Sequence, residues 1–293
     1  MKRDIVLVIG ANGQLGSVLI KELQTIHGNS NVIASDIYSD PNFQGIFQLL
    51  DATDMASIHI IIKKYSVTKI YHLAAILSAK GEQFPLKTWE LNTKMMLNVF
   101  EAARNSTVNK VFFPSSIAVY GNKAPLQNSP QSAFLNPATV YGISKATGEN
   151  WAQYYFEKYD LDIRSIRYPG IVGYQSMPGG GTTDYAVDIY HSAINKQTYN
   201  CFLKADTKLP MIFMDDAVRA TIELMQTPKD NLKTRTSYNL GSMSLNPSEI
   251  YESIKKKYPS FEIKYKPDFR QGIADNWPKR IDDKEARNDW GWE

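Results

Sequence analysis

Residues 5–16 read IVLVIGANGQLG, and this stretch decides the fold. The run up to Ile9 is apolar throughout, which is typical of a strand buried on both faces in a parallel sheet. Gly10, Gly13 and Gly16 then lead into a helix with apolar residues at helical spacing. Such a glycine-rich turn lets the backbone approach a pyrophosphate at the positive end of the helix. The spacing is GxxGxxG rather than GxGxxG, so tight packing between strand and helix is an alternative reason for the glycines.

Outward from this turn, apolar runs and helical patterns alternate as far as residue 173. The predicted strands are 5–10, 31–36, 46–54, 69–75, 110–116 and 161–173, the last including its exit loop. The predicted helices are 14–26, 55–65, 86–105 and 139–159. This alternation indicates right-handed βαβ crossovers, so we predict an α/β fold with a Rossmann-type, doubly wound parallel sheet.

The second half is less regular. We predict helices near 184–195, 215–226 and 246–258, the last beginning with Asn246 as N-cap and Glu249 in a capping box. We therefore expect residues 1–170 to form the Rossmann domain. Residues 171–293 would form mainly a smaller substrate-binding lobe on the C-terminal side, with some segments returning to the sheet. Within it lies GGGTTDYAVDIY (179–190), either a flexible linker or a wrap that approaches a small ligand closely.

Composition narrows the function. Of 293 residues 43% are hydrophobic and 22% charged, and the net charge of +3 is too small to argue for nucleic acid or a membrane surface. One cysteine, Cys201, and four histidines without HExxH-like spacing make a metal site unexpected. We see no apolar run long enough for a transmembrane helix and no signal peptide, so we expect a cytoplasmic protein.

Acidic and small residues mark a dinucleotide site at the strand ends. Asp36 ends the second strand, where a carboxylate binds both ribose hydroxyls of an adenosine and repels a 2′-phosphate, so we predict NAD rather than NADP. A simple turn residue is the alternative. Asp51 follows the third strand and could reach the adenine amino group. The sequence HLAA (72–75) ends the fourth strand with residues small enough for a dinucleotide to cross, and its His72 is predicted to be a core residue rather than a catalyst.

The candidate chemistry lies in VYGISK (140–145). Tyr141 and Lys145 are four residues apart on a predicted helix, so they face one side. A free tyrosine has a pKa near 10, and we expect the Lys145 ammonium to lower it enough for Tyr141 to act as a base. Ser116, at the end of the fifth strand, could orient a substrate oxygen.

With the segments GANGQLG, HLAA, PSSIAVYG and YGISK, the chain resembles the extended short-chain dehydrogenase/reductase superfamily over nearly its whole length. The resemblance implies a Rossmann fold, NAD(P), a catalytic set of Ser116, Tyr141 and Lys145, and a homodimer formed through a four-helix bundle of the two long helices. The residues that we predict to contact the cofactor are Gly10, Asn12, Gly13, Gln14, Leu15, Gly16, Asp36, Asp51, Ala52, Leu73, Ala74, Ala75, Asn92, Tyr141, Lys145, Tyr168 and Ile171.

Two further segments, GGGTTDYAVDIY and RQGIADNWPKRIDD (270–283), are similar to the short-chain type L-threonine 3-dehydrogenases. That resemblance implies oxidation of the 3-hydroxyl of L-threonine to give 2-amino-3-oxobutanoate. The residues implied around the substrate are Ser78, Ser116, Tyr141, Gly180, Thr182, Asp184 and Trp277. Asp184 could meet the substrate ammonium or cap the following helix, and Trp277 could be a plain core residue.

Two rival functions stay open on the sequence. One is a nucleotide-sugar epimerase or dehydratase that uses the same tyrosine–lysine pair, although RYPGIVG (167–173) departs from the RYxNVYGP-like segment usual in those enzymes. The other is a non-catalytic, redox-sensing dinucleotide binder, a class that tends to lose the pair.

Overall fold

The computed structural model describes residues 4–175, 177, 179–241 and 243–293. At its centre is a six-stranded sheet, all parallel, in the order β3-β2-β1-β4-β5-β7. The strands are β1 (Val6–Ile9), β2 (Val32–Asp36), β3 (Ile46–Leu49), β4 (Lys69–His72), β5 (Lys110–Phe112) and β7 (Asp162–Arg164). The order reverses between β1 and β4, which makes their carboxyl ends the switch point where ligands bind in such sheets. The predicted Rossmann-type fold is confirmed.

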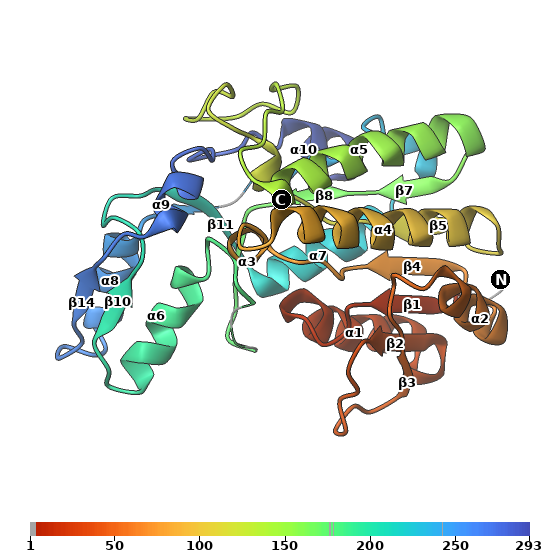
Figure 1. Ribbon diagram of the computed structural model, residues 1–293, viewed down its shortest axis with the longest axis horizontal. Helices are drawn as coiled ribbons and strands as arrows, with labels where there is room; N and C mark the ends of the chain where they lie inside the picture. The colour runs from red at the N-terminus through yellow and green to blue at the C-terminus, as the bar shows by residue number, and fades with distance from the viewer. Residues whose placement is uncertain (1–3, 176, 178, 242) are drawn as a thin grey trace.

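Helices cover both faces of this sheet, giving three layers (Figure 1). One face carries α1 (Gln14–His27) and α7 (Met214–Gln226), and the other carries α2 (Met55–Tyr65), α4 (Pro85–Arg104) and α5 (Val140–Tyr159). Strands β1 to β5 contribute alternate side chains to the two cores: Val6 and Val8 of β1 belong to one core, and Leu7 and Ile9 belong to the other. This double burial explains the uninterrupted apolar run in the sequence.

Two predicted strands prove to be several shorter ones. The fifth splits at Pro114 into β5 and β6 (Ser115–Ser116), and the sixth splits into β7, β8 (Ile166–Tyr168) and β9 (Gly170–Val172), with Pro169 between the last two. Proline has no N–H for a ladder, and the chain moves to a new sheet at Pro114 and at Pro169. The chain also changes sheet between β7 and β8, where Ser165 lies between the strands. The new sheets are β6-β8-β12 and β9-β11-β13, completed by β11 (Leu209–Phe213), β12 (Tyr238–Asn239) and β13 (Met243–Leu245).

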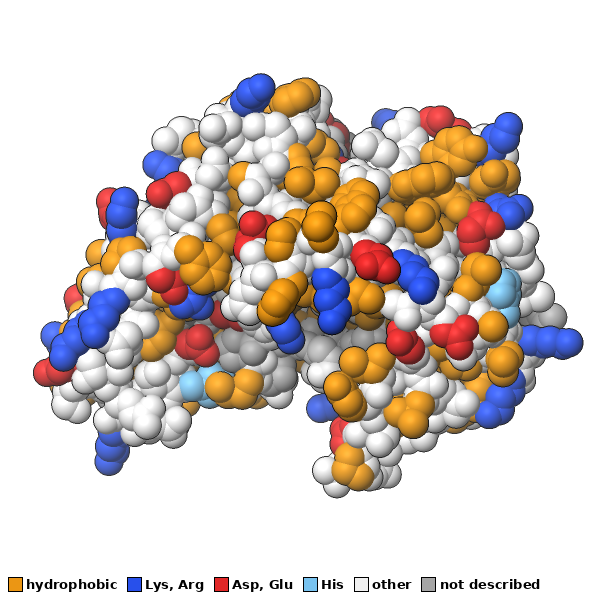
Figure 2. Space-filling model, in the orientation of Figure 1, with side chains coloured by type: hydrophobic (Ala, Val, Ile, Leu, Met, Phe, Trp, Pro, Cys, Tyr) orange, Lys and Arg blue, Asp and Glu red, His pale blue; other side chains and the backbone are white. Residues whose placement is uncertain are grey.

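A smaller group of elements lies at one end of the molecule, on the left of Figure 1. It contains α6 (Tyr185–Ile194), α8 (Pro247–Lys255), α9 (Phe269–Ala274) and the two-stranded sheet of β10 (Tyr199–Cys201) and β14 (Ile263–Tyr265). Its core includes Tyr185, Cys201 and Phe261, and α8 starts with the predicted capping box of Asn246 and Glu249. In Figure 2 the surface is indented between this group and the central sheet.

The short elements complete the chain. They are α3 (Ser78–Gly81), α10 (Lys284–Trp290) and the 3-10 turns Asn29–Asn31, Ile117–Val119 and Lys229–Asn231. Helix α10 returns to β12, and its Ala286 is buried in the same core as α1 and α7. The domain boundary at residue 170 stays a prediction.

Candidate active site

A cleft of about 340 Å³ opens at the carboxyl ends of β1 and β4. It is lined from both parts of the molecule, by the glycine turn on one side and by the loop before α6 on the other. The predicted site residues that line it are Gly10, Gly13, Gln14, Leu15, Gly16, Leu73, Ala75, Ser78, Ser116, Tyr141, Lys145, Tyr168, Ile171, Thr182, Asp184 and Trp277. Residues predicted for cofactor, catalysis and substrate therefore meet in one cavity.

The glycine turn serves both close packing and an open helix end. Gly10 has φ +89°, and a Cβ there would lie 2.7 Å from the backbone nitrogen of Ala74. A Cβ on Gly16 would lie 2.3 Å from the carbonyl oxygen of Gly10. No side chain in the described part of the chain caps α1, so its first-turn N–H groups are available to an anion. The glycines therefore serve tight packing, while the pyrophosphate site at the open helix end stays a prediction.

Asp36 is positioned beside this turn. One carboxylate oxygen accepts a hydrogen bond from the backbone N–H of Asn12 (3.0 Å), and the other accepts one from Ile37 (2.7 Å). The Asn12 side chain in turn donates to the carbonyl of Tyr38 (2.7 Å). The carboxylate is therefore held at the end of β2 next to the open end of α1, where the sequence argument requires it.

Several predicted cofactor residues do not line the cleft. The side-chain amide of Asn92 accepts a hydrogen bond from the backbone N–H of Ile76 (2.9 Å) and donates one to its carbonyl (3.0 Å). These two bonds fix the segment after β4. Asp51 is exposed and accepts from the N–H of Thr53, while the carbonyl of the buried Ala52 accepts from Asn98. The other predicted cofactor residues outside the lining are Asn12, Asp36 and Ala74. Gly180 is likewise outside it, although Gly179 and Gly181 are in it.

Tyr141 and Lys145 lie in the first two turns of α5, whose N-cap Thr139 accepts from the N–H of Gly142 (3.0 Å). Burial raises the pKa of Tyr141 to about 12, and hydrogen bonding to Ser116 opposes the rise. Burial also lowers the pKa of Lys145 to about 7. The expected lowering of the Tyr141 pKa by Lys145 is therefore not found, because the sequence pattern does not reveal that both groups are desolvated together.

A buried aromatic floor lies beneath Lys145. Its ammonium nitrogen is 4.6 Å from the ring centroid of Phe113 and 5.5 Å from that of Tyr141. The ring of His72 stacks on the ring of Phe113, with centroids 6.3 Å apart. Burial, and secondarily the charge of Lys145, lower the pKa of His72 to about 3, so it is neutral. His72 is buried as predicted, but its Nδ1 has no partner among the described residues.

The face of α5 that carries Tyr141 and Lys145 continues to Glu149, one turn beyond Lys145. Glu149 and Arg167 form a buried ion pair at 2.7 Å, with side chains 1% and 4% exposed. Glu149 also accepts from the hydroxyl of Ser115 (2.5 Å). Because Ser115 pairs with Arg167 and Ser116 with Tyr168 across β6 and β8, the ion pair holds α5 against the strands that carry Ser116 and Tyr168.

The side of the cleft that the sequence predicts for the substrate is formed by the glycine loop and α3. The hydroxyls of Ser78 and Thr182 are 3.0 Å apart, and the N–H of Thr182 donates to Ser78 (3.3 Å). Asp184 accepts from the N–H groups of Gly180 (2.8 Å) and Gly181 (2.7 Å), and its side chain makes no cap bond to α6. Burial raises the pKa of Asp184, with those two hydrogen bonds opposing. Its carboxylate thus shapes the loop, a role neither sequence alternative named.

Trp277 follows helix α9 in the chain and forms part of the wall of the cleft. Its side chain is buried and lines the cavity, and its indole N–H has no hydrogen-bond partner in the part of the chain that the structure describes. A buried donor without a partner is costly, so this one is suited to an acceptor on a ligand. The sequence analysis missed Leu77, which lines the cleft just before α3, and Phe113, whose ring lies near the Lys145 ammonium, because apolar residues in apolar runs carry no local signal.

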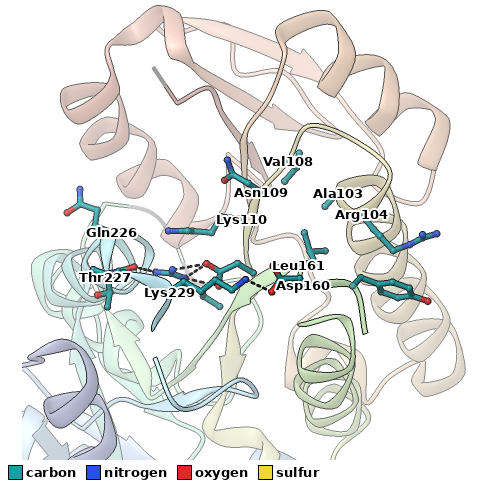
Figure 3. Close-up of a pocket in the computed structure, with 14 residues that line it drawn as sticks. Ala103, Arg104, Val108, Asn109, Lys110, Asp160, Leu161, Gln226, Thr227 and Lys229 are labelled. Carbon is teal, nitrogen blue, oxygen red and sulfur yellow. Dashed lines mark hydrogen bonds and ion pairs between the residues drawn. The ribbon is translucent and has the colours of Figure 1, made fainter. Parts of the chain in front are cut away.

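A second cavity, of about 520 Å³, lies at the opposite end of the sheet, beside the carboxyl ends of α4, α5 and α7 (Figure 3). Lys110 donates to the carbonyl of Met225 there (2.7 Å), and Arg164 donates to those of Leu224 (2.5 Å) and Thr227 (2.6 Å). These cations satisfy the carbonyls at the end of α7. None of the buried unpaired polar side-chain atoms found in the described residues lines this cavity, so the cleft with Trp277 is the better candidate site.

Among the described residues, no group of three or more His, Cys, Asp or Glu side chains is arranged to hold a metal ion. None of the helices described is both long and apolar enough to span a membrane.

Comparison with known proteins places the chain in a family. Residues 6–241 match the NAD dependent epimerase/dehydratase family. An uncharacterised epimerase/dehydratase of Staphylococcus haemolyticus is 41% identical, over 98% of this chain and 92% of the relative. A GalE-like L-threonine dehydrogenase from Cupriavidus necator in its holo form is 47% identical with a TM-score of 0.96, over 99% of this chain and 94% of that one.

A third relative is a monomeric L-threonine 3-dehydrogenase from a metagenome database, 45% identical with a TM-score of 0.96 over 99% of this chain and 93% of that one. These matches extend over the glycine turn, the Tyr141–Lys145 helix and the substrate side alike, and they confirm the predicted relationship to extended short-chain dehydrogenases/reductases. The chain belongs to the NAD dependent epimerase/dehydratase family.

Proposed function

We propose that the protein oxidises L-threonine at its 3-hydroxyl with NAD, giving 2-amino-3-oxobutanoate, NADH and a proton. The observation that carries the proposal is the single cleft in which Ser116, Tyr141 and Lys145 meet the substrate-side residues Thr182 and Trp277. The close solved structures named L-threonine dehydrogenases support the choice of substrate.

The cofactor end suits a nicotinamide dinucleotide. The uncapped start of α1 and the glycine cradle would take the pyrophosphate, and Asp36 would accept from the adenosine ribose hydroxyls. A carboxylate at that place disfavours a 2′-phosphate, which supports NAD over NADP. Bound NAD would supply the acceptor for the hydride that leaves C3 of the substrate.

The protein's own groups would handle the proton. Tyr141, as phenolate, would take the proton of the threonine hydroxyl, and Ser116 would hold that hydroxyl in place. With a pKa of about 12, Tyr141 is a phenol in the free protein at neutral pH. Ser116 as a donor, and Lys145 whenever it is charged, favour the phenolate. Turnover should therefore rise with pH above neutrality.

The substrate side offers a matching set of polar groups. The indole N–H of Trp277, which has no partner among the described residues, would donate to the threonine carboxylate, and Ser78 and Thr182 line the same cleft. Asp184 lines the same cleft and would place a carboxylate near the substrate ammonium. Enclosure by the glycine loop would exclude water and align the reacting carbon.

The structure gives less support to the two rival functions than to oxidation of L-threonine. A nucleotide-sugar substrate carries a diphosphate, yet Lys145 is the only Lys or Arg among the described residues that line the cleft. A non-catalytic sensor has no need for a buried tyrosine–lysine pair, which costs desolvation energy.

The test is NADH formation by the purified protein, followed by absorbance. L-threonine, L-allo-threonine, L-serine and UDP-glucose would be offered in parallel, each with NAD and with NADP. We expect turnover of L-threonine with NAD. Release of UDP-galactose from UDP-glucose, with no oxidation of any amino acid, would favour the epimerase, and binding of NAD without turnover of any substrate would favour the sensor.

We also propose that two copies associate through α4 and α5. Apolar side chains gather over these helices on the face shown in Figure 2, and Leu86, Ile143 and Tyr154 are 83%, 44% and 45% exposed. One of the similar solved structures is described as monomeric, so the number of copies in solution needs to be measured. Light scattering after size exclusion should give a dimer that Ile143→Glu converts to a monomer; a monomeric wild type would refute this.

A further inference from the structure

Helix α3 lies between the glycine loop and the helix that carries Tyr141. On one side, its Ser78 contacts Thr182, and the backbone N–H of Lys80 donates to the carbonyl of Gly180 (3.2 Å). On the other side, Glu82, the residue after α3, accepts a hydrogen bond from the backbone N–H of Val140 (2.8 Å). A Cβ on Gly81 would lie 3.6 Å from the side chain of Val140, so the two elements are in direct contact.

The Glu82 bond reaches a group that α5 itself leaves unsatisfied. Val140 is the first residue of α5, and the first-turn N–H groups of a helix have no partner within it. Thr139 satisfies Gly142 from within the same segment, whereas Glu82 satisfies Val140 from 58 residues earlier in the chain. Since Tyr141 is the next residue, the position of the candidate base relative to α3 depends on this contact.

We propose that Glu82 is a positioning residue that couples the glycine loop to Tyr141. When the glycine loop contacts Ser78 and Lys80, it holds α3 in one position. The hydrogen bond from Val140 to Glu82 then holds the start of α5, and with it Tyr141, in a fixed position relative to α3. The inference rests on the proposed function, because it concerns the placement of the proposed base and of the loop that encloses the substrate. It adds a residue that touches neither substrate nor cofactor in that proposal.

The competing explanation is a helix cap that contributes only stability. Three variants separate the two. Glu82→Gln keeps an oxygen that can accept from Val140, Glu82→Ala removes it, and Thr139→Ala removes the other cap of α5 without touching α3. Asn246→Ala removes the cap of α8 and is the control for a loss of stability elsewhere.

For Glu82→Ala we expect kcat for L-threonine to fall about tenfold, which is about 1.4 kcal/mol, and KM for L-threonine to rise, because the start of α5 loses its hydrogen bond to the residue after α3. Glu82→Gln should stay within about twofold of wild type. Thr139→Ala should lower kcat with little change in KM, and Asn246→Ala should lower Tm with wild-type kinetics. Wild-type kinetics in Glu82→Ala, or a pattern equal to that of Thr139→Ala, would overturn the proposal.

Hydrogen exchange gives a readout that does not need the reaction. In Glu82→Ala the amides of Gly180 and Gly181 should exchange faster together with that of Val140, whereas in Thr139→Ala only the start of α5 should change. Unchanged exchange in the glycine loop of Glu82→Ala would refute the coupling. If wild type fails to oxidise L-threonine, the proposed function fails, but this exchange comparison still decides the role of Glu82.

Discussion

Replacing Lys145 with methionine should make the free protein more stable, although it removes a proposed catalytic group. Lys145 is buried, with 4% of its surface exposed, and burial lowers its pKa from 10.5 to about 7. At about 1.4 kcal/mol for each pH unit, that difference corresponds to a cost of about 5 kcal/mol for the charged form. The buried rings of Phe113 and Tyr141 favour the ammonium by about 2 kcal/mol, so the expected net cost is about 3 kcal/mol.

The cost depends on pH with a definite sign. Below pH 7 the folded and unfolded chains both hold the proton on Lys145, so the folded state bears the whole cost. Between pH 7 and about 10.5 the folded chain has lost a proton that the unfolded chain still binds, so wild-type stability rises with pH. Above that range neither state holds the proton, and the cost vanishes.

Urea unfolding of wild type and Lys145→Met at about pH 6, 8 and 10 measures this difference. The variant should exceed wild type by about 3 kcal/mol at the lowest pH, and the excess should shrink as pH rises. Lys63→Met, at an exposed position of α2, is the control and should show no such trend. A variant no more stable than wild type at low pH, with a difference that does not vary with pH, would refute the reasoning.

Four further predictions concern single residues. Tyr141→Phe should lower kcat by at least roughly 10²-fold while leaving the Kd for NAD unchanged by calorimetry, and near-normal kcat would remove Tyr141 as the base. Asp36→Ala should raise the Kd for NAD roughly tenfold or more and relax discrimination against NADP; an unchanged preference in paired titrations would contradict its assignment. Glu149→Gln leaves Arg167 buried without a counter-ion and should lower the free energy of unfolding by about 3–5 kcal/mol, so a loss below about 1 kcal/mol in urea would count against the network. Trp277→Phe removes one donor and should raise KM for L-threonine about 10–100-fold in steady-state assays, with an unchanged KM refuting the carboxylate contact.

The order of the central elements was predictable because a doubly wound sheet leaves a strong pattern. Strands such as β1 and β4 are buried on both faces and read as apolar runs, and the helices between them have apolar residues at helical spacing. The breaks at Pro114 and Pro169 were not predicted, since which sheet a strand joins depends on partners far along the chain. The strands β10 to β14 were missed because most have two or three residues, too few for a periodicity.

The sequence was enough to predict which residues form the candidate site, but not how deeply they are buried or how burial shifts their pKa values. Tyr141, Lys145 and Ser116 were found from their spacing, and the structure brings them to one cleft. The direction of the Tyr141 pKa shift was wrong because burial is a property of the whole fold. Glu82 could not be found from sequence, since it completes a helix that starts 58 residues later.

The contact between Ser78 and Thr182 joins residues 104 positions apart, and that between Tyr120 and Asn239 joins residues 119 apart. During translation, the glycine turn at residues 10–16 emerges from the ribosome long before Thr182 and Trp277. Contacts of such separation also form slowly, because loop closure comes first. The sheet face covered by α2, α4 and α5 can therefore be structured while synthesis continues, whereas the face with α1 waits for α7 and α10. The residues around Thr182 and Trp277 also arrive late. Catalytic competence is the final property that the growing chain acquires.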